Sequence, residues 1–306
     1  MERKAEKGGE KMPYTSFSSI IPSFLIILIG YAVGKVFSDE VVGLASKVAI
    51  WVMVPTVTFT FINKYTPGFS ELRDFGLGII VIFLFFYLYS SFFKHRRGVV
   101  LVTAVTSNAG YLGYPILMSL WGEQALALGV VYALLIVLMY TILPAFLGER
   151  FNLKNLFKLP YIYALPAGFI TGKLGLHYED LPSYLLSAIN MLKQAAIPYL
   201  LLYVGLSVSR VKMDKRVTGL GGLIIFNKLF LSPLIALLFV MIYKLDGLSG
   251  KVFILETAMP TAINSVVIVS ALGGDSKTVG LGVTLTTFFA IFTLPIWAVL
   301  LEKIFG

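Results

Sequence analysis

Long apolar stretches joined by short polar connections make up most of this chain and restrict it to the interior of a lipid bilayer. Ten of them can be drawn, near residues 17–36, 41–62, 75–93, 98–120, 124–147, 160–177, 183–208, 219–243, 251–273 and 279–302. Each reaches or nearly reaches the roughly 20 apolar residues that a helix needs to cross the hydrocarbon core. Hydrophobic residues form 58% of the chain and charged residues 13%, which is typical of a multi-pass membrane protein. We therefore expect an all-α membrane protein with ten transmembrane helices.

The composition also narrows the chemistry. The chain has no cysteine and only two histidines, His95 and His177, which disfavours thiol catalysis and a resident metal centre, so we expect no cofactor. We find no HExxH motif, no nucleophile elbow and no paired aspartates in facing stretches, so an enzyme is not expected. The net charge of +9 is explained by basic cytoplasmic loops, and no nucleic-acid partner is expected.

Basic residues in three connections predict the orientation in the membrane. They are Lys94, Arg96 and Arg97, then Arg150, Lys154 and Lys158, and finally Arg210, Lys212, Lys215 and Arg216. With ten helices these connections share one side of the membrane, which the positive-inside rule makes cytoplasmic. Both termini are then outside a plasma or inner cell membrane. Residues 1–16, where Lys and Arg alternate with Glu, are expected to form a disordered polar tail.

An internal repeat relates the two halves of the chain. The motif GYAVGK at 30–35 recurs as GFITGK at 168–173, and Pro55 and Pro115 are matched by Pro198 and Pro260. The order of these matches predicts a duplicated unit of five helices, one over 17–148 and the other over 149–306. Because five is odd, the second copy enters the membrane from the opposite side, as in the inverted repeats of secondary transporters.

Two matched stretches interrupt their helices at membrane depth: SNAGYLGYP at 107–115 and AMPTAINS at 258–265. Proline removes a backbone donor and glycine lets the chain bend, so the predicted break positions are Gly110, Gly113, Pro115 and Pro260. One break alone is as consistent with a packing kink as with a site. Two equivalent breaks indicate a binding site near the middle of the membrane, because irregular backbone there must be covered by protein or line a cavity.

The residues around the breaks suit a small anion. Helix N-termini attract negative charge, whereas the carbonyls freed at the breaks suit a cation, and neutral amides and hydroxyls can orient a ligand. The substrate-binding candidates are Asn108, Tyr111, Pro115, Pro260, Thr261, Asn264 and Ser265. Glu256, one turn before Pro260, is an ionisable group at membrane depth; it could bind Na⁺ or carry a proton, unless it lies at the interface. Lys193 and Lys228 are interpreted as lysines that extend their ammonium groups to the membrane surface.

The motifs NAGYLGYP at 108–115 and AMPTAINSVVIVSALGGD at 258–275 resemble the paired signatures of the auxin efflux carrier family, prokaryotic type. The likeness extends from about residue 17 to 303. This family is similar to the bile acid sodium symporters, in which two inverted five-helix repeats form a scaffold and a moving transport core. The resemblance implies that spans one, two, six and seven form the scaffold, which is often dimeric. Spans three to five and eight to ten would form the transport core, in which the helices of spans four and nine cross.

The resemblance also implies roles for single residues. Asn108 would contact substrate, and Ser107, Asn108 and Glu256 would be the polar positions that bind sodium in the bile acid branch, although plant auxin carriers are thought to work without sodium. We therefore expect a secondary transporter of elevator type that moves a small organic anion, with Na⁺ or H⁺ as the coupling ion, and a homodimer joined through scaffold helices. The alternatives are a symporter of the bile acid type, or a channel or substrate sensor on the same fold.

Overall fold

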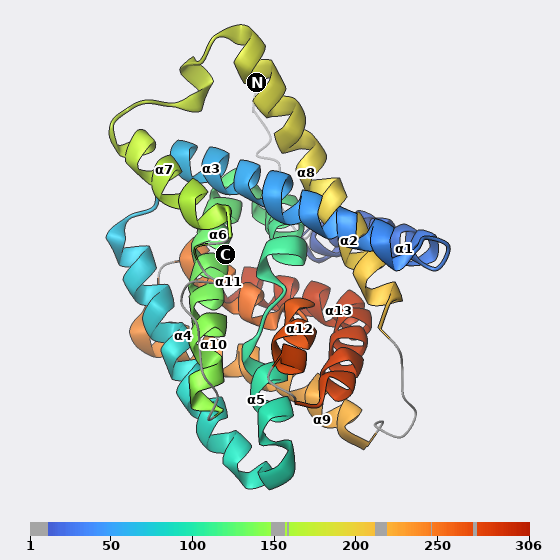
Figure 1. Ribbon diagram of the computed structural model, residues 1–306. Coiled ribbons are helices and arrows are strands. Elements are labelled where there is room, and N and C mark those ends of the chain that lie inside the picture. The colour runs from blue at the N-terminus through green and yellow to red at the C-terminus, as the bar shows by residue number, and fades with distance from the viewer. Residues whose placement is uncertain (1–11, 148–156, 158, 212–218, 246, 272–273) are drawn as a thin grey trace, which may run out of the picture.

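The fold is taken from a computed structural model, in which the described residues are 12–147, 157, 159–211, 219–245, 247–271 and 274–306. Within these ranges all regular structure is helical (Figure 1). Most of the basic connections at 148–158 and 212–218, and residues 1–11 of the expected polar tail, lie outside the described residues. Residues 12–16 were also expected to belong to that tail, but they lie in the first helix, which begins at Met12.

The helices follow one another closely along the chain. The first half contains α1 (Met12–Gly34), α2 (Asp39–Val48), the π-helical turn η1 (Ala49–Met53), α3 (Val54–Lys64), α4 (Phe69–Ser90), η2 (Ser91–Arg96), α5 (Arg97–Val105), η3 (Ala109–Gly113) and α6 (Tyr114–Phe146). The second half contains α7 (Tyr161–Lys173), η5 (Tyr178–Asp180), α8 (Ser183–Ser209), α9 (Gly221–Phe226), η7 (Asn227–Leu231), α10 (Ser232–Tyr243), α11 (Gly247–Ala258), α12 (Asn264–Ala271) and α13 (Ser276–Phe305). Every apolar stretch predicted from the sequence overlaps at least one of these helices.

Five mainly helical stretches in the described ranges are long and apolar enough to cross a membrane. They are Asp39–Lys64, Phe69–Phe146, Ser183–Ser209, Gly221–Tyr243 and Ser276–Phe305, and Ser18–Gly34 is a shorter apolar helix. The second stretch is not one straight helix, because the chain turns at Lys94, where φ is 23°, and at Gly122, where φ is 77°. That φ at Gly122 is readily adopted only by glycine. The chain is therefore a helical, membrane-embedded protein.

The helices form two groups that are packed against each other (Figure 1). The first helix group consists of α1, α2, α3, α7 and α8, which lie across the top of the view; α1 packs along α8, and α3 along α7. The second helix group consists of α4, α5, α6 and α9 to α13 below them. Contacts of α3 and α8 with α6, and of α1 with α13, join the two groups.

The repeated glycine motif brings two helix pairs of the first group into close contact. A Cβ atom at Gly30 would lie 2.2 Å from the Leu202 carbonyl oxygen, so α1 can approach α8 this closely only with glycine there. In the second copy of the motif, a Cβ atom at Gly172 would lie 2.6 Å from the Asn63 carbonyl oxygen of α3. Small residues allow such backbone contact between membrane helices. The two copies of the motif thus have the same packing role.

Three prolines each follow a π-helical turn. They are Pro55, Pro115 and Pro233, at the start of α3, α6 and α10. In each case the residue before proline donates its N–H to the carbonyl five residues earlier: Val54 to Ala49, Tyr114 to Ala109 and Ser232 to Asn227. A proline ring clashes with the carbonyl four residues earlier, and the wider turn relieves this clash. Helix therefore continues past each of these prolines.

Candidate functional site

Two helices are interrupted in the middle of the second helix group, and their irregular segments lie against each other. α5 ends at Val105 and helix resumes at Ala109, so residues 106–108 are irregular; α11 ends at Ala258 and α12 begins at Asn264, so 259–263 are irregular. The backbone N–H of Asn108 donates to the Pro260 carbonyl over 2.9 Å. The two breaks therefore satisfy part of each other's backbone hydrogen bonding, as buried irregular backbone must.

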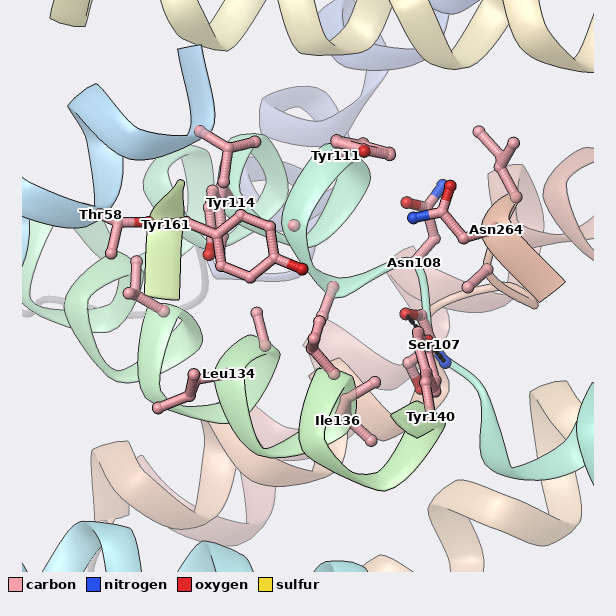
Figure 2. A pocket seen from close by; sticks show the side chains of 18 of the residues that line it. Thr58, Ser107, Asn108, Tyr111, Tyr114, Leu134, Ile136, Tyr140, Tyr161 and Asn264 are labelled. Atoms are coloured by element: carbon pink, nitrogen blue, oxygen red, sulfur yellow. Dashed lines mark hydrogen bonds between the residues drawn. The ribbon is translucent and has the colours of Figure 1, made fainter. Parts of the chain in front are cut away.

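A cavity opens beside the two breaks, with about 630 Å³ of space not filled by atoms, its open mouth included. Figure 2 shows the side chains of Asn108, in the first break, and Asn264, the first residue of α12 after the second break, next to each other at one end of it. Tyr111, Tyr140 and Tyr161 also line the cavity. Within the described part of the chain no charged side chain lines it. Its polar groups are amides, hydroxyls and the backbone at the start of two helices.

The amide nitrogen of Asn108 is the most informative atom of the cavity. It is buried, and it has no hydrogen-bond partner among the described residues. A buried donor without a partner is unfavourable by about 1–3 kcal/mol. Because Asn108 lines the cavity, this donor is available to a ligand there.

The residues predicted to bind substrate divide into two sets. Those that line the cavity are Asn108, Tyr111 and Asn264, together with Ser107 and Gly110 from the other predicted sets. Those that do not line it are Pro115, Pro260, Thr261 and Ser265. The latter hold the breaks together: the Thr261 hydroxyl donates to the Thr103 carbonyl over 2.9 Å, and the Ser265 hydroxyl to that of Thr106 over 2.8 Å.

The predicted break positions are placed differently from one another. Pro260 lies in the irregular segment 259–263, whereas Gly110 and Gly113 lie in the π-helical turn η3, just after the irregular residues 106–108. Pro115 begins α6. The helix is therefore interrupted upstream of its glycines and proline, at the position where it meets the other break.

Sequence reasoning missed several cavity residues. Thr58 of α3 and Tyr161 of α7 belong to the first helix group, and only the packing of the two groups brings them to the cavity. Tyr140 of α6 accepts the Ser107 N–H over 2.9 Å and donates to the Ser107 carbonyl over 2.8 Å. In the sequence, Tyr140 looks like any other aromatic residue of a membrane helix, so no local pattern marked it as a cavity residue.

Lys228 is also part of this region, and its interpretation as a lysine that reaches the membrane surface is wrong. The side chain has 0% exposure. Its ammonium donates to the Ser107 hydroxyl over 2.7 Å and to the carbonyls of Thr257, over 3.1 Å, and Ala104, over 3.4 Å. Lys228 lies in η7, on a face packed against the breaks rather than against lipid. An ionisable residue in the middle of an apolar span was the available signal.

Lys193 is partly exposed and pairs with a charged residue of the second helix group. Its ammonium forms an ion pair with Glu123 over 2.9 Å, and its side chain is 15% exposed. It also lies 4.4 Å from the centre of the Phe61 ring. Glu123 comes directly after the turn at Gly122, so this pair joins α8 to α6.

Glu256 is fully buried inside the protein, in the last turn of α11 before the second break. Neither of its carboxylate oxygens has a hydrogen-bond partner within the described ranges, and it does not line the cavity. Its carboxylate packs against two glycines. A Cβ atom built on Gly113 would lie 2.4 Å from both Glu256 carboxylate oxygens, and one built on Gly129 would lie 2.9 Å from Glu256 Oε1. Among the described residues, no ion pair within 4.0 Å joins Glu256 to Lys228.

A helical protein embedded in the membrane, with a polar cavity where two interrupted helices meet, has the architecture of a transport protein. Residues 144–298, just over half of the chain, match the family described as membrane transport protein, which is the auxin efflux carrier family, and the chain belongs to it. It is 25% identical to an uncharacterized transporter of Methanocaldococcus jannaschii over 294 residues, which cover 89% of this chain and 94% of that one. It is 26% identical to an uncharacterized transporter of Methanothermobacter thermautotrophicus over 306 residues, covering 94% and 98%. The family and these relatives are transporters rather than enzymes, and the resemblance seen in the two motifs is confirmed.

Proposed function

We propose that this chain is a secondary transporter that binds a small organic anion in the cavity between Asn108 and Asn264. The observation that carries this proposal is the buried Asn108 amide nitrogen, a donor without a partner, at the place where two helices begin. Helix N-termini favour an anion, and an uncharged, donor-rich cavity binds a carboxylate without trapping it. Tyr111 and Ser107 are further candidates for contact with the substrate.

The proposed architecture is ten membrane passes in two inverted repeats of five. The equivalent use of the glycine motif supports it: the first span packs on the seventh through Gly30, and the sixth packs on the second through Gly172. The two breaks come from the fourth and ninth spans, which are equivalent positions of the repeats. With the basic connections in the cytoplasm, both termini are proposed to be outside.

The proposed movement is of elevator type. The first helix group would be the scaffold and would join two copies into a homodimer, and the second would be the transport core, which carries both breaks and Glu256. Most of the cavity lies on the core, but Thr58 and Tyr161 come from the scaffold, so displacement of the core would open the site from one side to the other. Glu256, with Ser107 and Asn108, is our candidate position for coupling to Na⁺ or H⁺.

Transport by purified protein in proteoliposomes tests the proposal. We expect saturable uptake of a labelled small carboxylate, accelerated by unlabelled substrate loaded inside, and a loss of at least about tenfold in Asn108→Ala and in Asn264→Ala. The tenfold figure corresponds to about 1.4 kcal/mol, the scale of one hydrogen bond to a charged group. Asn190→Ala in α8, away from the cavity, is the matched control and should retain full activity.

The same vesicles separate the alternatives. Flux that does not saturate and is not accelerated by internal substrate would indicate a channel. Tight binding without flux would indicate a sensor. Undiminished uptake in both asparagine variants would refute the assignment of the site, and imposed sodium or pH gradients identify the coupling ion.

A further inference from the structure

The Lys228 ammonium is surrounded by oxygen atoms from both interrupted helices. Ser107 Oγ and the Ala104 carbonyl belong to the first break and its preceding helix, and the Thr257 carbonyl belongs to the last turn before the second break. The distance of 2.7 Å to Ser107 Oγ is typical of a charge-assisted hydrogen bond. Carbonyl and hydroxyl oxygens at helix C-terminal ends are also the ligands that transporters use for a monovalent cation.

The buried charges in this region disfavour the binding of a further cation. Lys228 and Glu256 are the two charged side chains with 0% exposure among the described residues, and their formal charges cancel. A sodium ion at Ser107 would compete with the ammonium for the same oxygens. It would also add an uncompensated positive charge to a fully buried site, which is unfavourable.

We propose that the Lys228 ammonium is a built-in substitute for a bound cation at the junction of the two breaks, so that the site forms without sodium. The side chain contacts α5, Ser107 and α11 as a bound ion would, and it places an ammonium group behind Ser107, which lines the cavity. This inference rests on the proposed function and narrows it, because it assigns no sodium ion to Ser107.

Thermal unfolding of the full-length protein in nanodiscs tests the inference without any substrate. The melting temperature is measured in sodium chloride and in choline chloride of equal ionic strength, for the wild type, Lys228→Ala and Lys193→Ala. We expect no sodium-specific change in the wild type. Lys228→Ala should melt lower in choline and should rise by about 3 °C or more in sodium, because the vacated oxygens then bind the ion. Lys193→Ala removes a lysine of the other helix group and should gain no sodium response.

Two further variants make the test decisive. Adding Ser107→Ala to Lys228→Ala should abolish the sodium response, and Lys228→Gln, which loses the charge but keeps a polar side chain, should show it if Lys228→Ala does not fold. A sodium-specific stabilisation of the wild type that Ser107→Ala removes would overturn the inference. Folded Lys228 variants that ignore sodium would also overturn it. Because no transport is measured, these results stand even if no carboxylate proves to be a substrate.

Discussion

At the scale of single residues, two buried asparagines differ in what their amides contact. Asn63 in α3 donates to Thr171 Oγ1 and to the Leu176 carbonyl, and it accepts from the Tyr178 N–H, each over 2.9 Å. The amide nitrogen of Asn108 has no such partner in the described part of the chain. One side chain therefore joins helices, and the other keeps a donor open toward the cavity.

This difference predicts that substitution by alanine lowers stability at Asn63 but impairs substrate binding at Asn108. Asn63→Ala removes three hydrogen bonds and should lower stability by about 2 kcal/mol, since each such bond contributes about 0.5–1 kcal/mol. Asn108→Ala removes a buried donor that has no partner, so it should not lower stability, while it weakens substrate binding by at least about tenfold. Chemical or thermal unfolding of both variants in detergent measures this. Equal destabilisation of the two would show that Asn108 serves packing rather than a ligand.

Residue roles were predictable from the sequence only where a local pattern marked them. Asn108 and Asn264 were identified because each belongs to a Pro-containing interruption of an apolar span. Tyr140 and Thr58 reach the cavity through contacts between distant helices, which no local pattern records. Lys228 carried a usable signal, since it is an ionisable residue within an apolar span. The sequence alone does not show which face of that helix is buried, so it could not distinguish a lysine packed against a break from one that reaches the membrane surface.

At the scale of elements, the approach of α1 to α8 depends on glycine at both helices. A Cβ atom at Gly205 of α8 would lie 2.1 Å from the Ile27 carbonyl oxygen, which cannot move without shifting α1. Gly205→Ala should therefore separate the helices and lower the melting temperature by several degrees, a loss of about 1–3 kcal/mol. Thermal unfolding of the purified protein measures it.

The matched control is Gly76→Ala in α4, where a Cβ atom would meet nothing within 4 Å. This substitution should be neutral or stabilise the helix by about 0.5–1 kcal/mol, because alanine restricts the unfolded chain more than glycine does. A fall in melting temperature as large as that of Gly205→Ala would mean that any alanine is harmful in these helices. The close contact would then not be the cause.

The helices themselves were largely predictable, because apolar length determines where a membrane span can be. The exact form of the interruptions was not. Pro55, Pro115 and Pro233 each follow a π-helical turn, whereas Pro198 and Pro295 lie inside α8 and α13. The first break lies at 106–108, upstream of its glycines, because its position is set by hydrogen bonds to the second break rather than by its own sequence.

At the scale of the whole molecule, Glu123 connects the two helix groups. It belongs to α6 of the second group and forms ion pairs with Lys64 of α3 over 3.0 Å and Lys193 of α8 over 2.9 Å, both of the first group. It also accepts the hydroxyl of Tyr65 over 2.8 Å. If the groups move as scaffold and core, these contacts hold the molecule in the state seen here.

Glu302 is the matched control, because its contacts stay within the second helix group. It pairs with Lys251 over 2.9 Å and accepts the indole N–H of Trp121. Its side chain is 22% exposed, close to the 26% of Glu123. The two glutamates thus differ mainly in whether they connect the groups.

Glu123→Gln should therefore shift the balance between conformations, whereas Glu302→Gln should not. Loss of partly exposed ion pairs weakens the connection by about 1 kcal/mol, which changes a two-state ratio about fivefold. The chain has no cysteine, so spin labels at Ser187→Cys in α8 and Lys277→Cys in α13, both exposed, report the distance between the groups directly. In Glu123→Gln alone, a second distance between the two labels should appear in the distribution and become more populated. An unchanged distribution, or an equal change in Glu302→Gln, would mean that Glu123 does not hold the groups together.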